Sequence, residues 1–223
     1  MAESTDARCH LVVSRLLDYP DQALVADLPV LAEVGAGLPQ GWLLRPLLGH
    51  LEAAPLLELQ QDYVATFDQR RRCCLYLTYY AYGDTRKRGA ALLEFKQAYR
   101  AAGVELDDGE LPDHLCVLLE FAGSVDPAAG RRLLLEHRAG MELLHLSLRD
   151  AGSPYAGALA AVSATLPPLR GDERDAVRRL VAQGPPGEDV GLDPFGPPTG
   201  VPATAVPGSR TAFIDVASVG VRR

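Results

Sequence analysis

Apolar residues recur every three or four positions along the first 183 residues, which is the spacing of one face of an α-helix. Proline, glycine and short polar residues interrupt this pattern at intervals. We therefore expect a series of helices rather than a sheet. Apart from the tyrosine-rich segment discussed below, the expected helices lie near residues 6–17, 22–34, 41–54, 55–67, 85–102, 112–122, 127–149, 154–166 and 172–183.

Prolines and a glycine define several of these boundaries. The first helix should end before Pro20, because a residue that precedes proline is pushed out of the helical region. Pro29 interrupts the second, which leaves either one kinked helix or two short helices. Pro112 and Pro127 suit the first position of a helix, and Gly140 is expected to divide the helical stretch that follows Pro127.

The composition changes after residue 183. Residues 184–210 contain six Gly and seven Pro, so they lack the apolar side chains that would stabilise an ordered structure. The last thirteen letters, TAFIDVASVGVRR, are too short for a domain but long enough to add a strand. We predict an all-α, single-domain helical bundle over 1–183, followed by a flexible, disordered Pro/Gly-rich C-terminal tail over 184–223.

Net charge, the lengths of apolar runs and the cysteine pattern argue against several classes of protein. A formal net charge of −7 argues against a nucleic-acid-binding protein, which needs a broad basic face. The sequence contains no uninterrupted apolar run of membrane-spanning length and no signal peptide, so we expect no membrane insertion. The four cysteines form no CxxC pair, which favours reduced thiols and a cytoplasmic location.

Familiar catalytic motifs are missing from the sequence. It contains no GxxxxGK[ST] loop, no GxGxxG after a strand and no GxSxG, so we expect a protein that is not an enzyme. His137 and His145 could share a helix face, but no pair of acids completes a metal site. Cys73 and Cys74 suit either a soft-metal or redox site or a buried apolar position. The second is favoured, because zinc would need further ligands.

Charge is segregated in the middle of the chain. Residues 70–100 carry eight Lys/Arg against two acids, whereas residues 101–126 carry seven acids and no Lys/Arg. The basic residues form either a solvated face or a contact for phosphate or an acidic partner. The candidates for that contact are Arg70, Arg71, Arg72, Arg86, Lys87 and Arg88.

The tyrosines and the acidic segment each allow two interpretations. Tyr76, Tyr79 and Tyr80 are spaced to lie on one side of a helix, either as core residues or as a peptide-binding wall. In the segment ELPDHL, Leu111 is expected to cap the helix that Pro112 opens. The acids there either stabilise the helix dipole or bind a basic amphipathic segment, which a titrating histidine would tune.

A family resemblance rests on the same residues. The stretch YVATFDQRRRCCLYLTYYAYGDTRKRGAALLEFKQAYRAAG, followed by ELPDHLCVLLEFA, resembles the signature of NarJ-type nitrate reductase assembly chaperones. This family is also called the delta subunit or molybdenum cofactor assembly chaperone, within the redox-enzyme maturation chaperone group. The resemblance is specific over residues 56–123 and looser over LLLEHRAGMELLHLSLRDAGSPYAGAL and VGLDPFGPP. In the first fifty residues it rests mainly on LLDYPD.

The resemblance implies a non-catalytic cytoplasmic chaperone with an all-α fold. Such a protein binds the apo alpha subunit of respiratory nitrate reductase, chiefly its N-terminal segment. It supports molybdenum cofactor insertion and assembly of the membrane-bound complex. No cofactor is then bound stably, and molybdenum cofactor biosynthesis proteins are further expected partners. Two alternatives remain: a carrier that itself binds the molybdenum cofactor, and a helical adaptor with another partner.

The expected peptide-binding site combines the tyrosine segment with the ELPDHL motif and the apolar stripes beside them. Its residues are Tyr63, Phe67, Tyr76, Tyr79, Tyr80, Glu110, Leu111, Pro112, Asp113, His114, Leu115, Leu118 and Glu120.

Overall fold

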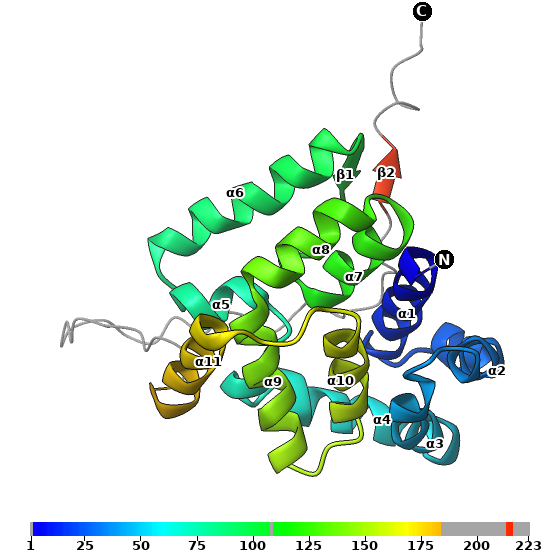
Figure 1. Cartoon of the computed structure of the whole chain (residues 1–223). Coiled ribbons are helices and arrows are strands. Elements are labelled where there is room, and N and C mark those ends of the chain that lie inside the picture. Colours follow the sequence, from blue (N-terminus) through cyan, green and yellow to red (C-terminus); the bar gives the residue numbers. More distant parts are fainter. Residues whose placement is uncertain (1, 108, 184–212, 216–223) are drawn as a thin grey trace, which may run out of the picture.

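The computed structural model describes residues 2–107, 109–183 and 213–215. The all-α prediction is confirmed (Figure 1). The helices are α1 Ala2–Leu16, α2 Gln22–Ala36, α3 Arg45–Ala53, α4 Leu56–Tyr63, α5 Leu77–Tyr82, α6 Arg86–Ala101, α7 Leu115–Ser124, α8 Pro127–Glu136, α9 Arg138–Asp150, α10 Ala156–Ala164 and α11 Gly171–Gln183. Shorter turns are the 3-10 helices η1 Gly41–Leu44 and η3 Arg71–Cys73, and the π-helix η2 Val64–Asp68.

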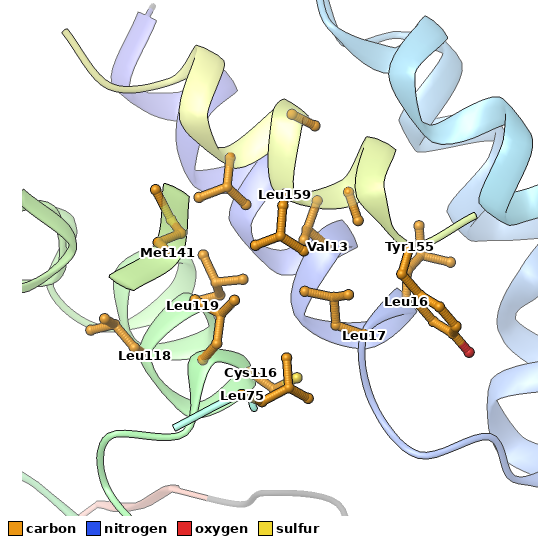
Figure 2. Packing of buried hydrophobic residues seen from close by; sticks show 14 of the residues in the cluster. Val13, Leu16, Leu17, Leu75, Cys116, Leu118, Leu119, Met141, Tyr155 and Leu159 are labelled. Carbon is orange, nitrogen blue, oxygen red and sulfur yellow. The ribbon is translucent and has the colours of Figure 1, made fainter. Parts of the chain in front are cut away.

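Helix α7 forms the centre of the core. It is apolar on almost every side, the pattern of a helix that is surrounded by others, and residues 115–119 are all buried. Helices α1 and α8 pack along it. In Figure 2, Leu119 of α7 points toward Val13 of α1 and Leu159 of α10, whereas Leu118 lies on the opposite side of α7. This packing fixes the N-terminus of α7, where the acidic motif enters the core.

Two glycines allow helices to approach closely. A Cβ atom added to Gly157 of α10 would overlap the carbonyl oxygen of Leu43 in η1. A Cβ atom added to Gly130 of α8 would overlap Ala122 of α7. Both glycines are therefore required by packing rather than by their backbone angles.

Several predicted boundaries are confirmed. Helix α1 ends before Pro20, and α2 continues through Pro29 as one helix. The carboxylate of Asp126 accepts a hydrogen bond from the Ala129 N–H at 2.9 Å, which caps α8. Gly103, directly after the cap of α6, has φ of +81°, a conformation that favours glycine.

Other boundaries were wrong. The helix expected at Pro112 begins at Leu115, with His114 as its N-cap, so Leu111 caps nothing. The stretch after Pro127 divides at His137 rather than at Gly140, because Gly140 packs against the ring of Tyr80 inside α9. The helix expected from residue 41 begins as the 3-10 turn η1.

A short strand qualifies the all-α description. Strand β1, Val104–Leu106, pairs antiparallel with β2, Phe213–Asp215, with Glu105 opposite Ile214. The expectation that the last segment adds a strand is confirmed for these three residues. The rest of the predicted tail, 184–212 and 216–223, lies outside the described residues. None of the described helices is long and apolar enough to cross a bilayer.

The glycine contact at η1 generates a stability prediction. Gly157→Ala should lower the free energy of unfolding by about 1–3 kcal/mol, because the new methyl group has no space beside Leu43. Gly49→Ala in α3, where no atom lies within 4 Å of the added Cβ, should raise it by about 0.5–1 kcal/mol. Urea unfolding of both variants checks this. Equal effects of the two substitutions on the free energy of unfolding would contradict the close contact between Gly157 and Leu43.

Candidate functional site

The tyrosine segment and the acidic motif meet as a short antiparallel bridge. Tyr76 pairs with His114 across it. The Leu77 N–H donates to the Asp113 carbonyl at 3.1 Å, and the Leu115 N–H donates to the Leu75 carbonyl at 2.9 Å. The two parts of the family signature, separated by α6 in the sequence, therefore lie side by side.

A buried carboxylate holds this bridge against α5. Asp113 has 0% exposure, and its Oδ2 accepts hydrogen bonds from the Thr78 N–H at 3.1 Å and the Thr78 hydroxyl at 2.5 Å. Because Thr78 lies in the first turn of α5, Asp113 caps that helix from another segment. Arg88 places Nη2 3.7 Å from the same oxygen, and its Nε donates to Thr78 Oγ1 at 3.1 Å. Oδ2 is thus hydrogen-bonded and close to a guanidinium group, which reduces the cost of burying the carboxylate, whereas Oδ1 has no hydrogen-bond partner among the described residues.

Tyr76 connects the bridge to the surface. Its hydroxyl donates to Glu110 Oε1 at 2.9 Å, and the same oxygen accepts from the Leu111 N–H at 2.7 Å. The ring packs edge-on against His114 with centroids 5.2 Å apart, and the Arg88 guanidinium lies 5.5 Å from the ring centroid, within cation–π range. Burial, together with Glu110, raises the pKa of Tyr76, so the hydroxyl remains a donor at neutral pH.

His114 lies beneath this surface among carboxylates. It is 8% exposed, and its Nδ1 has no hydrogen-bond partner among the described residues. Burial lowers the pKa of His114, although Glu110, Asp18, Asp113 and Asp68 all act to raise it. The imidazole is therefore neutral near pH 7, and it cannot offset the surrounding negative charge.

Two of those acids were not among the expected site residues. Asp18 follows α1 and is paired with Arg15 at 3.1 Å, whereas Asp68 ends the π-turn η2, is exposed and forms no hydrogen bond or ion pair with the described residues. Burial raises the pKa of both carboxyls. Asp18 lies in LLDYPD, the part of the first fifty residues that resembles the family, although that resemblance assigned it no role. Asp68 directly follows the apolar stripe that ends at Phe67, which is the one signal that could have suggested it.

Many of the expected peptide-binding residues are core residues in this structure. Tyr63 and Phe67 stack on each other with centroids 4.7 Å apart. Tyr80 donates its hydroxyl to the carbonyls of Arg72 and Cys74, at 3.1 and 2.8 Å. The remaining buried members of the expected set are Tyr79, Pro112, Asp113, His114, Leu115 and Leu118.

The members of that set that reach the surface are few. Leu111 is 40% exposed, Tyr76, Glu110 and Glu120 are half-buried, and Tyr76 is the N-cap of α5 rather than a helical residue. The prediction that Tyr76 shares a helix face with Tyr79 and Tyr80 was therefore wrong. The exposed part of the expected site consists of acidic groups, one tyrosine and one leucine.

The six basic candidates do not form one cluster. Arg88 is engaged by Asp113 and by Asp84, 3.1 Å away, while Arg86 and Lys87 are exposed in the first turn of α6. A separate cleft is lined by Arg70, Arg71, Arg72, Cys73, Ser147 and Asp150.

The thiols and histidines behave as structural residues. Burial raises the pKa of Cys73, and it raises that of Cys74 to about 11, so both are neutral thiols near pH 7. His137 is half-buried against Phe95, with ring centroids 4.9 Å apart. Within residues 2–107, 109–183 and 213–215, no group of three or more His, Cys, Asp or Glu is arranged to hold a metal ion.

Comparison with known proteins gives the family context. Residues 35–161 match the family model described as "Nitrate reductase delta subunit". The "Nitrate reductase-like protein NarX" of Mycobacterium tuberculosis is 44% identical over 153 residues, or 68% of this chain. That match spans only 23% of the mycobacterial protein.

Two further relatives cover most of their own length. The "Probable nitrate reductase molybdenum cofactor assembly chaperone NarJ" of Bacillus subtilis is 32% identical over 69% of this chain and 85% of its own. A solved structure from Archaeoglobus fulgidus, titled as a "Putative Redox Enzyme Maturation Protein", superposes with a TM-score of 0.53. It is 24% identical and covers 70% of this chain and 92% of the other, so it supports the fold.

The buried carboxylate can be tested by substitution. Asp113→Ala should lower the free energy of unfolding by about 3 kcal/mol, because α5 loses its cap and Arg88 keeps a poorly compensated charge. Glu110→Gln, which changes one charge near the surface, should alter it by less than about 0.5 kcal/mol. Chemical denaturation measures both. A small loss for Asp113→Ala would mean that Asp113 does not organise the bridge.

The lowered pKa of His114 makes stability depend on pH. In the unfolded chain histidine binds a proton below about pH 6.5, whereas folded His114 resists protonation. The contribution of His114 to the free energy of unfolding is therefore largest above that pH and decreases as the pH falls. His10, whose pKa burial lowers to about 4, and His137 act in the same direction. His114→Gln should reduce the slope between about pH 6.5 and 5 by at most about 1.4 kcal/mol per pH unit. An unchanged slope, measured by denaturation at several pH values, would contradict the assignment.

Proposed function

This chain belongs to the nitrate reductase delta subunit family, and from that premise we propose that it is a cytoplasmic, system-specific chaperone for the catalytic alpha subunit of a respiratory nitrate reductase. It binds the apo form, chiefly through that subunit's N-terminal segment. In that complex the client stays competent for molybdenum cofactor insertion and for assembly with the membrane-bound enzyme. The Bacillus subtilis relative is named as a probable nitrate reductase molybdenum cofactor assembly chaperone, which supports this role. The proposal assigns no catalytic step to this chain.

The observation that carries the proposal is the mixed acidic and apolar surface above His114. We call it the client surface, formed by Asp68, Tyr76, Glu110 and Leu111. Carboxylates and an exposed leucine together suit a basic amphipathic helix, whose charged face meets the acids while its apolar face covers Leu111. The expected ligand is therefore a short cationic helix with a few apolar side chains that contact this surface.

The protonation states around His114 favour such a ligand. Partial burial raises the pKa of Asp18 and Asp68, although Asp68 is exposed and Asp18 is already paired with Arg15. A cationic side chain of the client would add a favourable contact with these carboxylates. Since His114 remains neutral, it does not compete for the same carboxylates.

The buried residues of the expected site stabilise the client surface and do not contact the client themselves. Asp113 and Thr78 fix the start of α5, and the bridge between Tyr76 and His114 fixes the acidic loop against it. A preorganised surface loses little side-chain entropy when the client binds. Tyr63, Phe67, Tyr80 and Leu118 contribute through this rigidity.

Fewer residues support the alternative role, in which this chain itself binds the molybdenum cofactor. It would use the exposed arginines on phosphate oxygens, but Arg88 is already committed to Asp113 and Thr78. Equilibrium dialysis with the isolated cofactor separates the two roles. Retention by this chain alone favours a carrier, and retention only in the presence of apo alpha subunit favours a chaperone.

Charge substitutions test the client surface. Glu110→Gln combined with Asp68→Asn should weaken binding of a synthetic N-terminal peptide of the alpha subunit by about three- to tenfold, because two acids that face the cationic ligand are neutralised. Titration calorimetry at low and high salt measures the change.

A matched control uses acids elsewhere on the surface. Glu33→Gln on α2 combined with Asp175→Asn on α11 removes the same formal charge from two exposed positions and should leave the affinity within about twofold. If both double variants weaken binding equally, the interaction is non-specific. If the unmodified protein gives no heat with the peptide, the proposed client segment is wrong.

A further inference from the structure

The cleft beside η3 has three arginines on one side and a serine and an aspartate on the other. It has a volume of about 400 Å³ and lies between Arg70–Cys73 and the last turn of α9, where Ser147 and Asp150 form its other side. The arginine side chains are exposed, and they form no ion pair with the described residues. In contrast, the basic residue Arg88 is paired with two carboxylates.

The backbone beneath these arginines is held in place. The Cys73 N–H donates to the Arg70 carbonyl at 2.8 Å and closes the 3-10 turn. The buried Tyr80 hydroxyl donates to the carbonyls of Arg72 and Cys74 on either side of Cys73. The three guanidinium groups therefore extend from a fixed turn, so an anion that binds them does not have to order the loop first.

The local charge balance favours an anion. Asp150 is the single carboxylate that lines the cleft, and it already pairs with Arg149 at 2.8 Å. Burial raises the pKa of Cys73, so the thiol adds no negative charge. The cleft therefore has three positive charges and one negative charge, and the negative charge is already paired with Arg149. The Ser147 hydroxyl can donate a further hydrogen bond.

We propose that this cleft binds a small molecule through its phosphate or diphosphate group. Guanidinium groups recognise phosphate oxygens with strong, charge-assisted hydrogen bonds. The volume lies within the range of roughly 300–1,000 Å³ that is typical of small-molecule sites. The cleft is distinct from the client surface, since none of Asp68, Tyr76, Glu110 or Leu111 lines it.

A compact ligand fits better than an acidic protein segment. Asp150 and the negative end of the α9 dipole close one side of the cleft, and they would repel additional carboxylates along an extended chain. A phosphate group concentrates two charges at one point near the arginines. The inference therefore commits to a phosphorylated small molecule.

Inorganic pyrophosphate is the probe that tests the inference. Titration calorimetry with the full chain should show saturable binding that weakens with added salt. Arg70→Gln, Arg71→Gln and Arg72→Gln together should weaken it at least about tenfold, because charge-assisted hydrogen bonds are lost. Asp150→Asn should leave the affinity unchanged or increase it.

The matched control carries three substitutions outside the cleft. Arg45→Gln, Lys96→Gln and Arg179→Gln remove the same formal charge from exposed positions and should leave pyrophosphate binding within about twofold. Unfolding midpoints of both triple variants should match the parent, since the exchanged side chains form no hydrogen bonds with the described residues.

Three outcomes would overturn the inference. These are no binding of pyrophosphate by the parent protein, equal weakening by the two triple variants, and binding of a glutamate-rich peptide in place of pyrophosphate. Binding of the alpha-subunit peptide should be the same in the arginine triple variant and the parent. The phosphate site and the proposed function therefore fail or succeed separately.

Discussion

The buried carboxylate of Asp113 is the interaction on which the arrangement of the site depends. It caps α5 through Thr78, it pairs with Arg88 of α6, and its own backbone carbonyl accepts the Leu77 N–H. One side chain thereby connects the tyrosine segment, the basic helix and the acidic motif. A charge with 0% exposure is tolerated only because each of these partners is present.

The burial of Asp113 explains why some residues of the acidic motif stabilise the fold while others stay at the surface. In the segment ELPDHL, Pro112 and Asp113 turn inward and stabilise the fold, while Glu110 and Leu111 stay at the surface. The aromatic residues divide in the same way. Tyr63, Phe67 and Tyr80 fill the core, and Tyr76 alone among the expected tyrosines reaches from the bridge to an acid at the surface. This segment therefore contains scaffold residues as well as residues that stay accessible at the surface.

The helices were largely predictable from sequence, and the site was predictable only in part. Apolar spacing and the Asp126-Pro127 cap are local signals, so the positions of most helices follow from them. Leu-Pro-Asp also looks like a local helix start, but Asp113 is drawn to the N-terminus of α5 instead, so α7 begins three residues later. The contributions of Asp18 and Asp68 to the surroundings of His114 arise from tertiary packing, which no local pattern encodes.

Photo-crosslinking in cells tests the central claim, that the client binds over the acidic motif, most directly. A photoreactive phenylalanine analogue would replace Leu111, which is 40% exposed, and in a separate control Val181 of α11, which is 41% exposed. Both positions are equally accessible but lie on different elements. The account predicts that the probe at 111 captures the apo nitrate reductase alpha subunit through its N-terminal segment and that the probe at 181 does not. Capture at 181 alone, equal capture at both positions, or capture at 111 through another part of the subunit would contradict it.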